Sequence, residues 1–235
     1  MRATTMCLVA AAALCVYGAR PARAQQGATA AAPWQTLEEM PEARWEMASA
    51  MVGGTLYLFG GYGAGVQSSR HVDAFEVEDN AWRRLAELPS AITHMNAVAD
   101  GRSVWLAGGF KDGYPGHAID EVWRYDIDDD RFVATPPLPE PRAGGGLALV
   151  GRSLHYIGGL MSDRDTDSSD HWVLDLEGSG NWTNAAPMPV PRNQFGTISR
   201  DGRIYLTGGQ LGHDSRNGQP GLDQTRVDIY DPSTD

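Results

Sequence analysis

The chain has few cysteines and few basic residues, and these shortages exclude several classes of protein. Of its 235 residues only Cys7 and Cys15 are cysteines, and both lie in the first 24. A chain processed after Ala24 therefore has no disulfide, no thiol nucleophile and no thiolate metal ligand. It keeps 16 Lys and Arg against 30 Asp and Glu, a formal net charge of −14. We therefore expect no nucleic-acid partner, because phosphate binding needs a basic face.

Helical periodicity and long apolar runs are also scarce. The one extended apolar run, Met6 to Val16, follows Arg2 and precedes the small residues of Ala22-Arg23-Ala24. This order is typical of a signal peptide, and the run is too short to span a bilayer comfortably. We predict a signal peptide over residues 1–24 and an exported protein, periplasmic or extracellular, whose mature chain does not insert into a membrane.

What the chain does have is a repeat. A double glycine closes a short apolar run four times, at residues 60–61, 108–109, 158–159 and 208–209. A period near fifty residues, with several short apolar runs separated by turn residues, predicts radially repeated four-stranded sheets. We predict that residues 25–33, which are rich in Ala, Gln and Gly, are a flexible lead-in to the repeats at 34–235.

Each repeat contains the same predicted elements. An outer strand opens with an aromatic residue, at Trp34, Trp82, Phe132 and Trp182. A proline corner follows, because proline ends strand pairing and fixes a turn. Next come a hairpin whose second strand ends at the diglycine, a polar loop, and a third type of strand such as Val122 to Asp126.

This pattern resembles the kelch repeat, which combines Pro-x-Arg, a hairpin, a diglycine, Tyr-Asp and a tryptophan. The resemblance covers Trp34 to Asp235, with departures at Ile92, Phe132 and Leu174. It implies an all-β fold, a kelch-type β-propeller. Because kelch propellers usually have six or seven blades, we expect the four visible repeats to be part of a six-bladed propeller. The alternative is a four-bladed ring closed by Trp34.

The expected functional site is one rim of the propeller. Antiparallel strands bring the residues just after each proline to the same face as loops 62–71, 110–120, 160–170 and 210–225. The polar side chains gathered there are Arg44, His94, Asn96, Arg142, Arg192, Asn193 and Gln194. The arginines would bind a carboxylate or, alternatively, brace their own corners by donating to backbone carbonyls. His94 and Asn96 depart from the repeat pattern, and His94 is the candidate for a catalytic residue.

The sequence predicts neither a metal site nor a cofactor. The acidic loop 163–170 lacks the glycine and the glutamate that a helix-loop-helix calcium site needs. Neither His213 with Asp214 nor Asp112 with His117 shows an established metal-ligand spacing. We therefore interpret these side chains as solvated loop residues.

Two classes of function remain, because fold alone does not choose between them. The main prediction is a binding module that presents its rim to a glycan or a protein. The alternative is a sugar-active enzyme, since kelch propellers include copper-radical galactose oxidases and a sialic acid mutarotase (N-acetylneuraminate epimerase). The oxidase chemistry uses a cysteine linked to a tyrosine, which the mature chain lacks. A mutarotase needs an acid/base and a carboxylate anchor, which His94 with Arg142 or Arg192 could supply.

Overall fold

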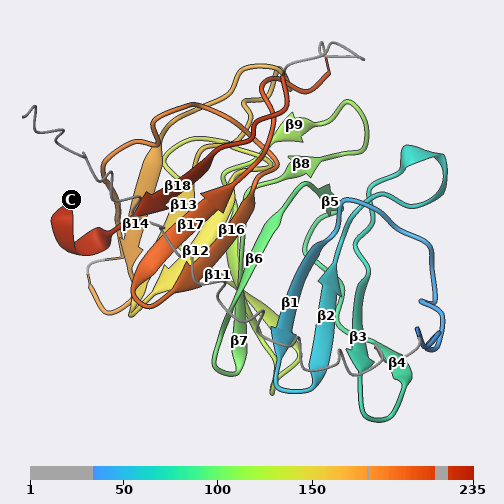
Figure 1. The fold of residues 1–235 in the computed structure, drawn as a ribbon. Coiled ribbons are helices and arrows are strands. Elements are labelled where there is room, and N and C mark those ends of the chain that lie inside the picture. Colours follow the sequence, from blue (N-terminus) through green and yellow to red (C-terminus); the bar gives the residue numbers. More distant parts are fainter. Residues whose placement is uncertain (1–33, 179, 215–221) are drawn as a thin grey trace, which may run out of the picture. The chain divides into compact units, whose positions relative to one another are not determined.

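The four predicted repeats form four antiparallel sheets in the computed structural model, which describes residues 34–178, 180–214 and 222–235 (Figure 1). The predicted signal peptide, the lead-in and residues 215–221 of the last loop lie outside these residues. Across the described part of the chain, no helix has the length and apolarity needed to cross a bilayer.

Each sheet is one blade, and its strands follow one another in chain order from the inside outwards. The strands of the first two blades are β1 (Ala48–Val52), β2 (Thr55–Phe59), β3 (Val72–Glu76), β4 (Ala81–Arg84), β6 (Asn96–Asp100), β7 (Ser103–Ala107), β10 (Val122–Asp126) and β11 (Arg131–Ala134). Those of the third and fourth are β12 (Gly146–Val150), β13 (Ser153–Ile157), β14 (His171–Asp175), β15 (Trp182–Asn184), β16 (Gly196–Arg200), β17 (Arg203–Thr207) and β18 (Val227–Tyr230).

Smaller elements lie outside the blades. The short strands β5 (Ile92–Thr93), β8 (Phe110–Lys111) and β9 (His117–Ala118) pair into a separate sheet. Two single-turn 3-10 helices, η1 and η2, cover Ala64–Val66 and Pro232–Thr234. The predicted outer-strand aromatics Trp82, Phe132 and Trp182 lie in β4, β11 and β15.

One predicted outer strand is wrong. Trp34 lies in no strand and its side chain is fully exposed. The aromatic residue alone therefore does not make an outer strand. The other three aromatics lie in strands that pair with the third strand of the same blade, as Trp82 does opposite Phe75.

The blades are arranged radially within the unit Leu37–Asp235. The innermost strands are neighbours in the order β1, β6, β12 and β16, and each blade extends outwards from its innermost strand (Figure 1). Sheets repeated in this way around an axis make a β-propeller. The predicted all-β propeller is confirmed.

Aromatic side chains fill the space between neighbouring blades. Phe59 in the first blade and Tyr125 in the second are both fully buried, and their ring centroids lie 5.6 Å apart. Tyr125 also packs against Phe132 of its own blade at 4.8 Å. A blade is thus stabilised mainly by its neighbour, because one sheet alone cannot bury both of its faces.

The diglycines join each blade to the next one. The amide of Gly109 donates to the carbonyl of Arg142 in the following blade at 2.8 Å. A Cβ atom on Gly108 would lie 2.4 Å from that carbonyl oxygen, and Gly108 has a φ of 63°. Glycine is required here by both the close approach and the left-handed backbone. The repeated motif of the sequence is therefore the docking point between blades.

Candidate functional site

The three corner arginines lie inside the blades. The exposed fractions of Arg44, Arg142 and Arg192 are 7%, 2% and 0%. Each guanidinium donates to a backbone carbonyl and pairs with a carboxylate, as Arg192 does with the Gly208 carbonyl at 2.9 Å and with Asp228 at 2.9 Å. These are the bracing contacts that the sequence analysis gives as the alternative to ligand binding.

Asn193 is also fully buried, and it joins two rim loops. Its Nδ2 donates to the Asp167 carboxylate at 2.7 Å and to the Gly212 carbonyl at 2.9 Å. Asp167 in turn accepts from the Gly212 amide at 2.6 Å. Part of the acidic loop is therefore structural, because Asp167 holds the segment that leads to His213.

Two residues after each corner position, the backbone turns left-handed at the rim. These positions are Glu46, His94, Gly144 and Gln194, with φ values of 53°, 53°, 60° and 50°. The amide of each of the last three donates to the carbonyl of the preceding one, at 3.2, 2.9 and 2.8 Å. A left-handed backbone is unfavourable for residues other than glycine, and such strain gathers at functional sites. We call these four residues the rim arc.

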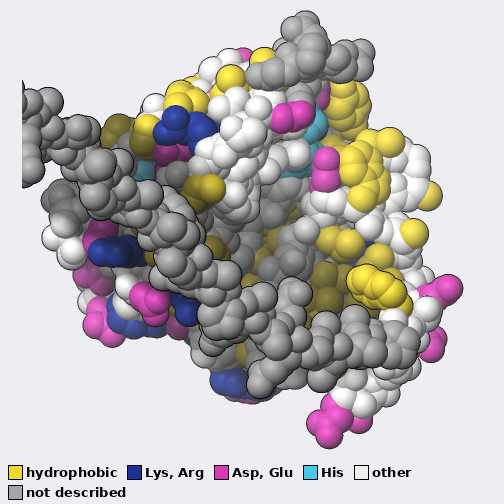
Figure 2. Space-filling model, in the orientation of Figure 1, with side chains coloured by type: hydrophobic (Ala, Val, Ile, Leu, Met, Phe, Trp, Pro, Cys, Tyr) yellow, Lys and Arg dark blue, Asp and Glu magenta, His cyan; other side chains and the backbone are white. Residues whose placement is uncertain are grey.

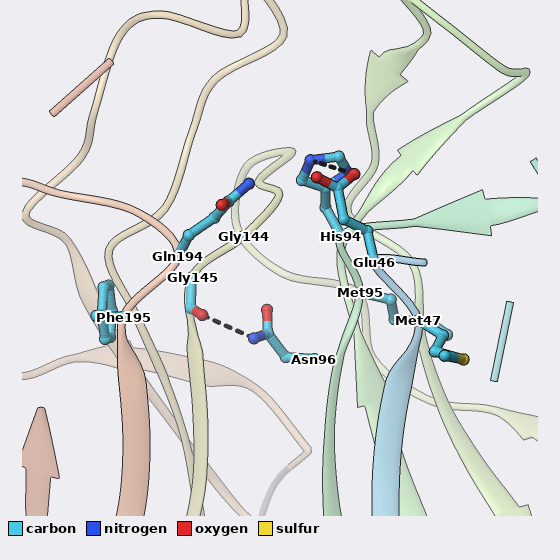
Figure 3. Close-up of a pocket in the computed structure, with 9 residues that line it drawn as sticks. All are labelled: Glu46, Met47, His94, Met95, Asn96, Gly144, Gly145, Gln194 and Phe195. Carbon is cyan, nitrogen blue, oxygen red and sulfur yellow. Dashed lines mark hydrogen bonds and ion pairs between the residues drawn. The ribbon is translucent and has the colours of Figure 1, made fainter. Parts of the chain in front are cut away.

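A pocket of about 160 Å³ opens beside the rim arc (Figure 3). Figure 3 shows Glu46 and His94 facing each other on one side, with Gln194 and Phe195 on the other. Asn96 points across the pocket, where its Nδ2 donates to the Gly145 carbonyl at 2.7 Å. The pocket is lined by Glu46, Met47, His94, Met95, Asn96, Gly144, Gly145, Gln194 and Phe195.

His94 is the most enclosed polar side chain of this pocket, with an exposed fraction of 6%. Its Nε2 lies 3.0 Å from Glu46 Oε2 and 3.3 Å from His213 Nε2, and its Nδ1 lies 3.0 Å from Thr93 Oγ1. Burial lowers the pKa of His94 although Glu46 opposes this shift. Burial therefore favours the neutral form of this imidazole.

The second histidine is oriented by a carboxylate. His213 Nδ1 lies 2.8 Å from Asp214 Oδ1, and Arg164 Nε lies 3.1 Å from the same carboxylate. Burial disfavours the charged form of Asp214, but the hydrogen bonds from His213 and Arg164 keep its pKa below the usual range. The Arg164 guanidinium itself stacks over Phe110 at 3.9 Å. Figure 2 shows histidine and acidic side chains next to each other on this face.

The comparisons with known proteins identify the repeat. A family model described as the KLHDC2/KLHL20/DRC7 Kelch-repeats domain matches residues 28–209. The chain belongs to the kelch-repeat family. Its kelch repeats are 28% identical to human Kelch-like protein 25 over 117 residues, and 30% identical to human Kelch-like protein 30 over 114 residues. These matches cover 48% and 47% of this chain but only 19% and 18% of the two relatives.

A solved structure supports the kelch propeller fold. The structure titled "Structure of YjhT" superimposes with a TM-score of 0.71 and covers 84% of this chain and 72% of that one. The sequence identity is 18%, so this likeness concerns the fold alone. A kelch propeller is a binding-module kind of fold, whose specific ligand depends on the residues of its rim.

The kelch pattern locates only part of this rim. His94, Asn96 and Gln194, predicted from the sequence, meet at the pocket, whereas the arginines and Asn193 are buried and do not line it. Glu46 was not predicted, although aligning the repeats places it at the same position as His94 and Gln194. The proximity of His213 to His94 was not predicted either, because these residues are 119 positions apart and no spacing relates them.

Proposed function

We propose that this kelch propeller is an exported binding module that holds one neutral sugar ring of a glycan in the rim pocket. The observation that carries this proposal is the composition of the pocket. Glu46, Asn96 and Gln194 offer carboxylate and amide groups to sugar hydroxyls, and Met95 and Phe195 offer apolar surface to a ring face. Pockets with a few convergent polar groups on an apolar lining are typical ligand sites.

The size of the pocket supports a single ring. An apolar cavity of about 150 Å³ holds one benzene molecule, and this pocket has about 160 Å³. Asn96 Oδ1 is buried without a hydrogen-bond partner in the protein, so it is an acceptor that a ligand hydroxyl can satisfy. Because loops of a rigid scaffold surround the pocket, the remainder of a glycan can extend over the rim.

A neutral sugar is preferred to an acidic one because of the charges at the site. Glu46 faces the pocket, and the nearby corner arginines Arg142 and Arg192 already pair with Asp170 and Asp228. A ligand carboxylate would therefore meet the like charge of Glu46, and these two guanidinium groups are already paired. The same contacts weaken the alternative of a sialic acid mutarotase, which needs a carboxylate anchor beside His94.

The glycan proposal predicts that binding depends on Gln194. We expect saturation-transfer NMR on the mature protein to detect galactose or N-acetylglucosamine in preference to N-acetylneuraminate. Gln194→Ala removes an exposed amide at the pocket and should weaken binding roughly tenfold, which corresponds to about one net hydrogen bond. Asn184→Ala, which removes an amide from the exposed outer strand β15, is the matched control and should leave binding unchanged.

Three outcomes would contradict the glycan proposal. The proposal is wrong if none of the three sugars shows saturable binding. It is also wrong if the same pocket binds a peptide instead, which would indicate a protein-binding function. Equal loss of affinity in Gln194→Ala and Asn184→Ala would place the sugar outside the rim pocket.

Export is supported by residues 1–24 and has its own test. Expression of the whole chain in a bacterial host, followed by fractionation, should yield a processed form outside the cytoplasm whose first residue is Gln25. Replacing Leu8 and Val9 with Arg interrupts the apolar run and should leave an unprocessed chain in the cytoplasm. A full-length chain in the cytoplasm without these substitutions would contradict export.

A further inference from the structure

We propose that Glu46, His94 and His213 form a site for one divalent transition-metal ion, preferably Zn²⁺. This inference goes beyond the proposed glycan binding, although Glu46 and His94 also line the rim pocket. One ligand atom of each residue, a carboxylate oxygen or an imidazole nitrogen, lies within 4.8 Å of the other two. The three residues come from the first blade, the second blade and the loop that follows the diglycine of the fourth.

The distances between these atoms suit a tetrahedral ion. Ligand atoms at the zinc bond length of about 2.0–2.1 Å are separated by roughly 3.3–3.4 Å in a tetrahedron. His94 Nε2 lies 3.3 Å from His213 Nε2 and 3.0 Å from Glu46 Oε2. Two edges of the coordination tetrahedron are thus already close to their required length.

On both histidines, a contact at Nδ1 orients the ring so that the Nε2 lone pair can point towards the proposed metal position. The ionised Asp214 carboxylate accepts from His213 Nδ1–H at 2.8 Å, which leaves the Nε2 lone pair of His213 directed at His94. His94 Nδ1 faces Thr93 Oγ1 at 3.0 Å, so its Nε2 can likewise carry a lone pair. Metal-bound histidines almost always have such a partner on the other nitrogen. Two imidazole lone pairs and a carboxylate oxygen that converge in this way can bind a metal cation between them.

The surroundings keep the three ligands in place. The rim arc fixes the backbone of Glu46 and His94, and the His94 amide donates to the Glu46 carbonyl. The third ligand, His213, is held by its backbone amide, which donates to the Asp165 carboxylate at 3.2 Å. The contacts of Asn193 and Asp167 described above hold the neighbouring Gly212. Pre-positioned ligands of this kind lose little conformational entropy on binding.

The donor set indicates the class of metal. Two imidazoles and one carboxylate are a typical zinc set with a fourth position left for water or a ligand, and imidazole does not suit magnesium or calcium. The ligands carry one negative charge in total, so a divalent ion leaves the site with one positive charge. The preference for a neutral sugar argued above therefore applies to the metal-free pocket. A ligand in the rim pocket could approach the fourth position, because two of the three ligands line that pocket.

Metal titration of the mature protein tests this site. After dialysis against EDTA and then metal-free buffer, calorimetry should show one Zn²⁺ per chain, and Co²⁺ should give the visible absorption of a four-coordinate ion. Mg²⁺ and Ca²⁺ should not bind measurably. We expect His213→Ala to lower zinc affinity at least hundredfold and Asp214→Asn to lower it about 10–100-fold, as losses of a ligand and of its orienting partner do.

The controls separate this site from adventitious binding and from the glycan proposal. His117→Ala removes an exposed histidine that lies 3.6 Å from Asp112 and should leave zinc affinity unchanged. Because His94 is buried, Glu46→Gln and His213→Ala are the variants that report on the site if His94→Ala does not fold. Zinc binding that is absent, or that survives His213→Ala, would overturn the site. Sugar binding measured in EDTA tests the glycan proposal independently.

Discussion

Asp73→Asn should be among the most destabilising single substitutions in this propeller, with a loss of about 3–5 kcal/mol in the free energy of unfolding. Asp73 and the side chain of Arg44 are both fully buried, and the Asp73 carboxylate pairs with Arg44 and, at 2.6 Å, with Arg84. The amide keeps the shape of the carboxylate but leaves the Arg44 guanidinium buried without its counter-charge. Burial disfavours the charged form and lowers the pKa of Arg44, and the attraction of Glu42 opposes this shift only in part.

Thermal unfolding followed by circular dichroism measures this effect. For a domain of this size the expected fall in Tm is about 10 °C. Asp128→Ala is the control, because it removes the partner of Arg102 in a pair whose side chains are both more than half exposed. Its Tm should stay close to that of the parent. Equal shifts for the two variants would mean that the corner arginine does not brace its blade.

Asp73→Asn should also weaken the proposed metal site, because the corner that Asp73 stabilises precedes the ligand Glu46. Arg44 donates to the Gly60 carbonyl at 2.7 Å and to the His71 carbonyl at 2.8 Å, and Glu46 follows two residues later. A corner without its carboxylate holds the left-handed turn at Glu46 less firmly. Zinc affinity in Asp73→Asn should therefore fall even though no ligand changes.

The sequence predicted the parts of the fold that every repeat must form. The diglycines could be recognised because Gly60, Gly108 and Gly158 approach the next blade so closely that no side chain fits. The arginines were equally visible, but their role was not, since a guanidinium that binds a ligand and one that braces a corner occupy the same place in the motif. Only their buried contacts distinguish the two roles.

The site was harder to predict because it is made of exceptions to the repeat. Glu46, His94 and Gln194 occupy one structural position with three different side chains, so no consensus points to them. His213 lies in a loop of the fourth repeat, and only the radial arrangement of the blades brings it to within 3.3 Å of His94. Contacts across the axis of a propeller leave no fixed spacing in the chain.

His155 also departs from the repeat pattern. Because its imidazole is buried, we expect the protein to lose stability in acid. It occupies the position of Tyr57 and Tyr205 in other blades and is buried, as expected of a packing residue. Its Nδ1 lies 2.9 Å from His171 Nε2, and the Tyr230 ring packs against both histidines. Burial, with a smaller contribution from His171, lowers the pKa of His155 from 6.5 to about 4 although Asp235 opposes the shift.

The direction of the pH effect follows from proton binding. Between pH 6.5 and 4 the unfolded chain binds a proton at His155 that the folded chain does not bind, so acid favours unfolding. The contribution of His155 to stability is complete above pH 6.5 and is lost as the pH falls towards 4. The expected loss at pH 5 relative to pH 7.5 is about 2 kcal/mol. Burial also lowers the pKa of His171, which adds to the loss in the same direction.

Urea unfolding at pH 7.5 and pH 5 isolates the contribution of this histidine. His155→Gln keeps a polar side chain of similar length beside His171 but removes the titration, so the difference in unfolding free energy between the two pH values should shrink by about 2 kcal/mol. His117→Gln removes an exposed histidine and should not change that difference. If His155→Gln kept the full pH dependence, the acid sensitivity would have to arise elsewhere, and His155 would serve only to pack the third blade against the fourth.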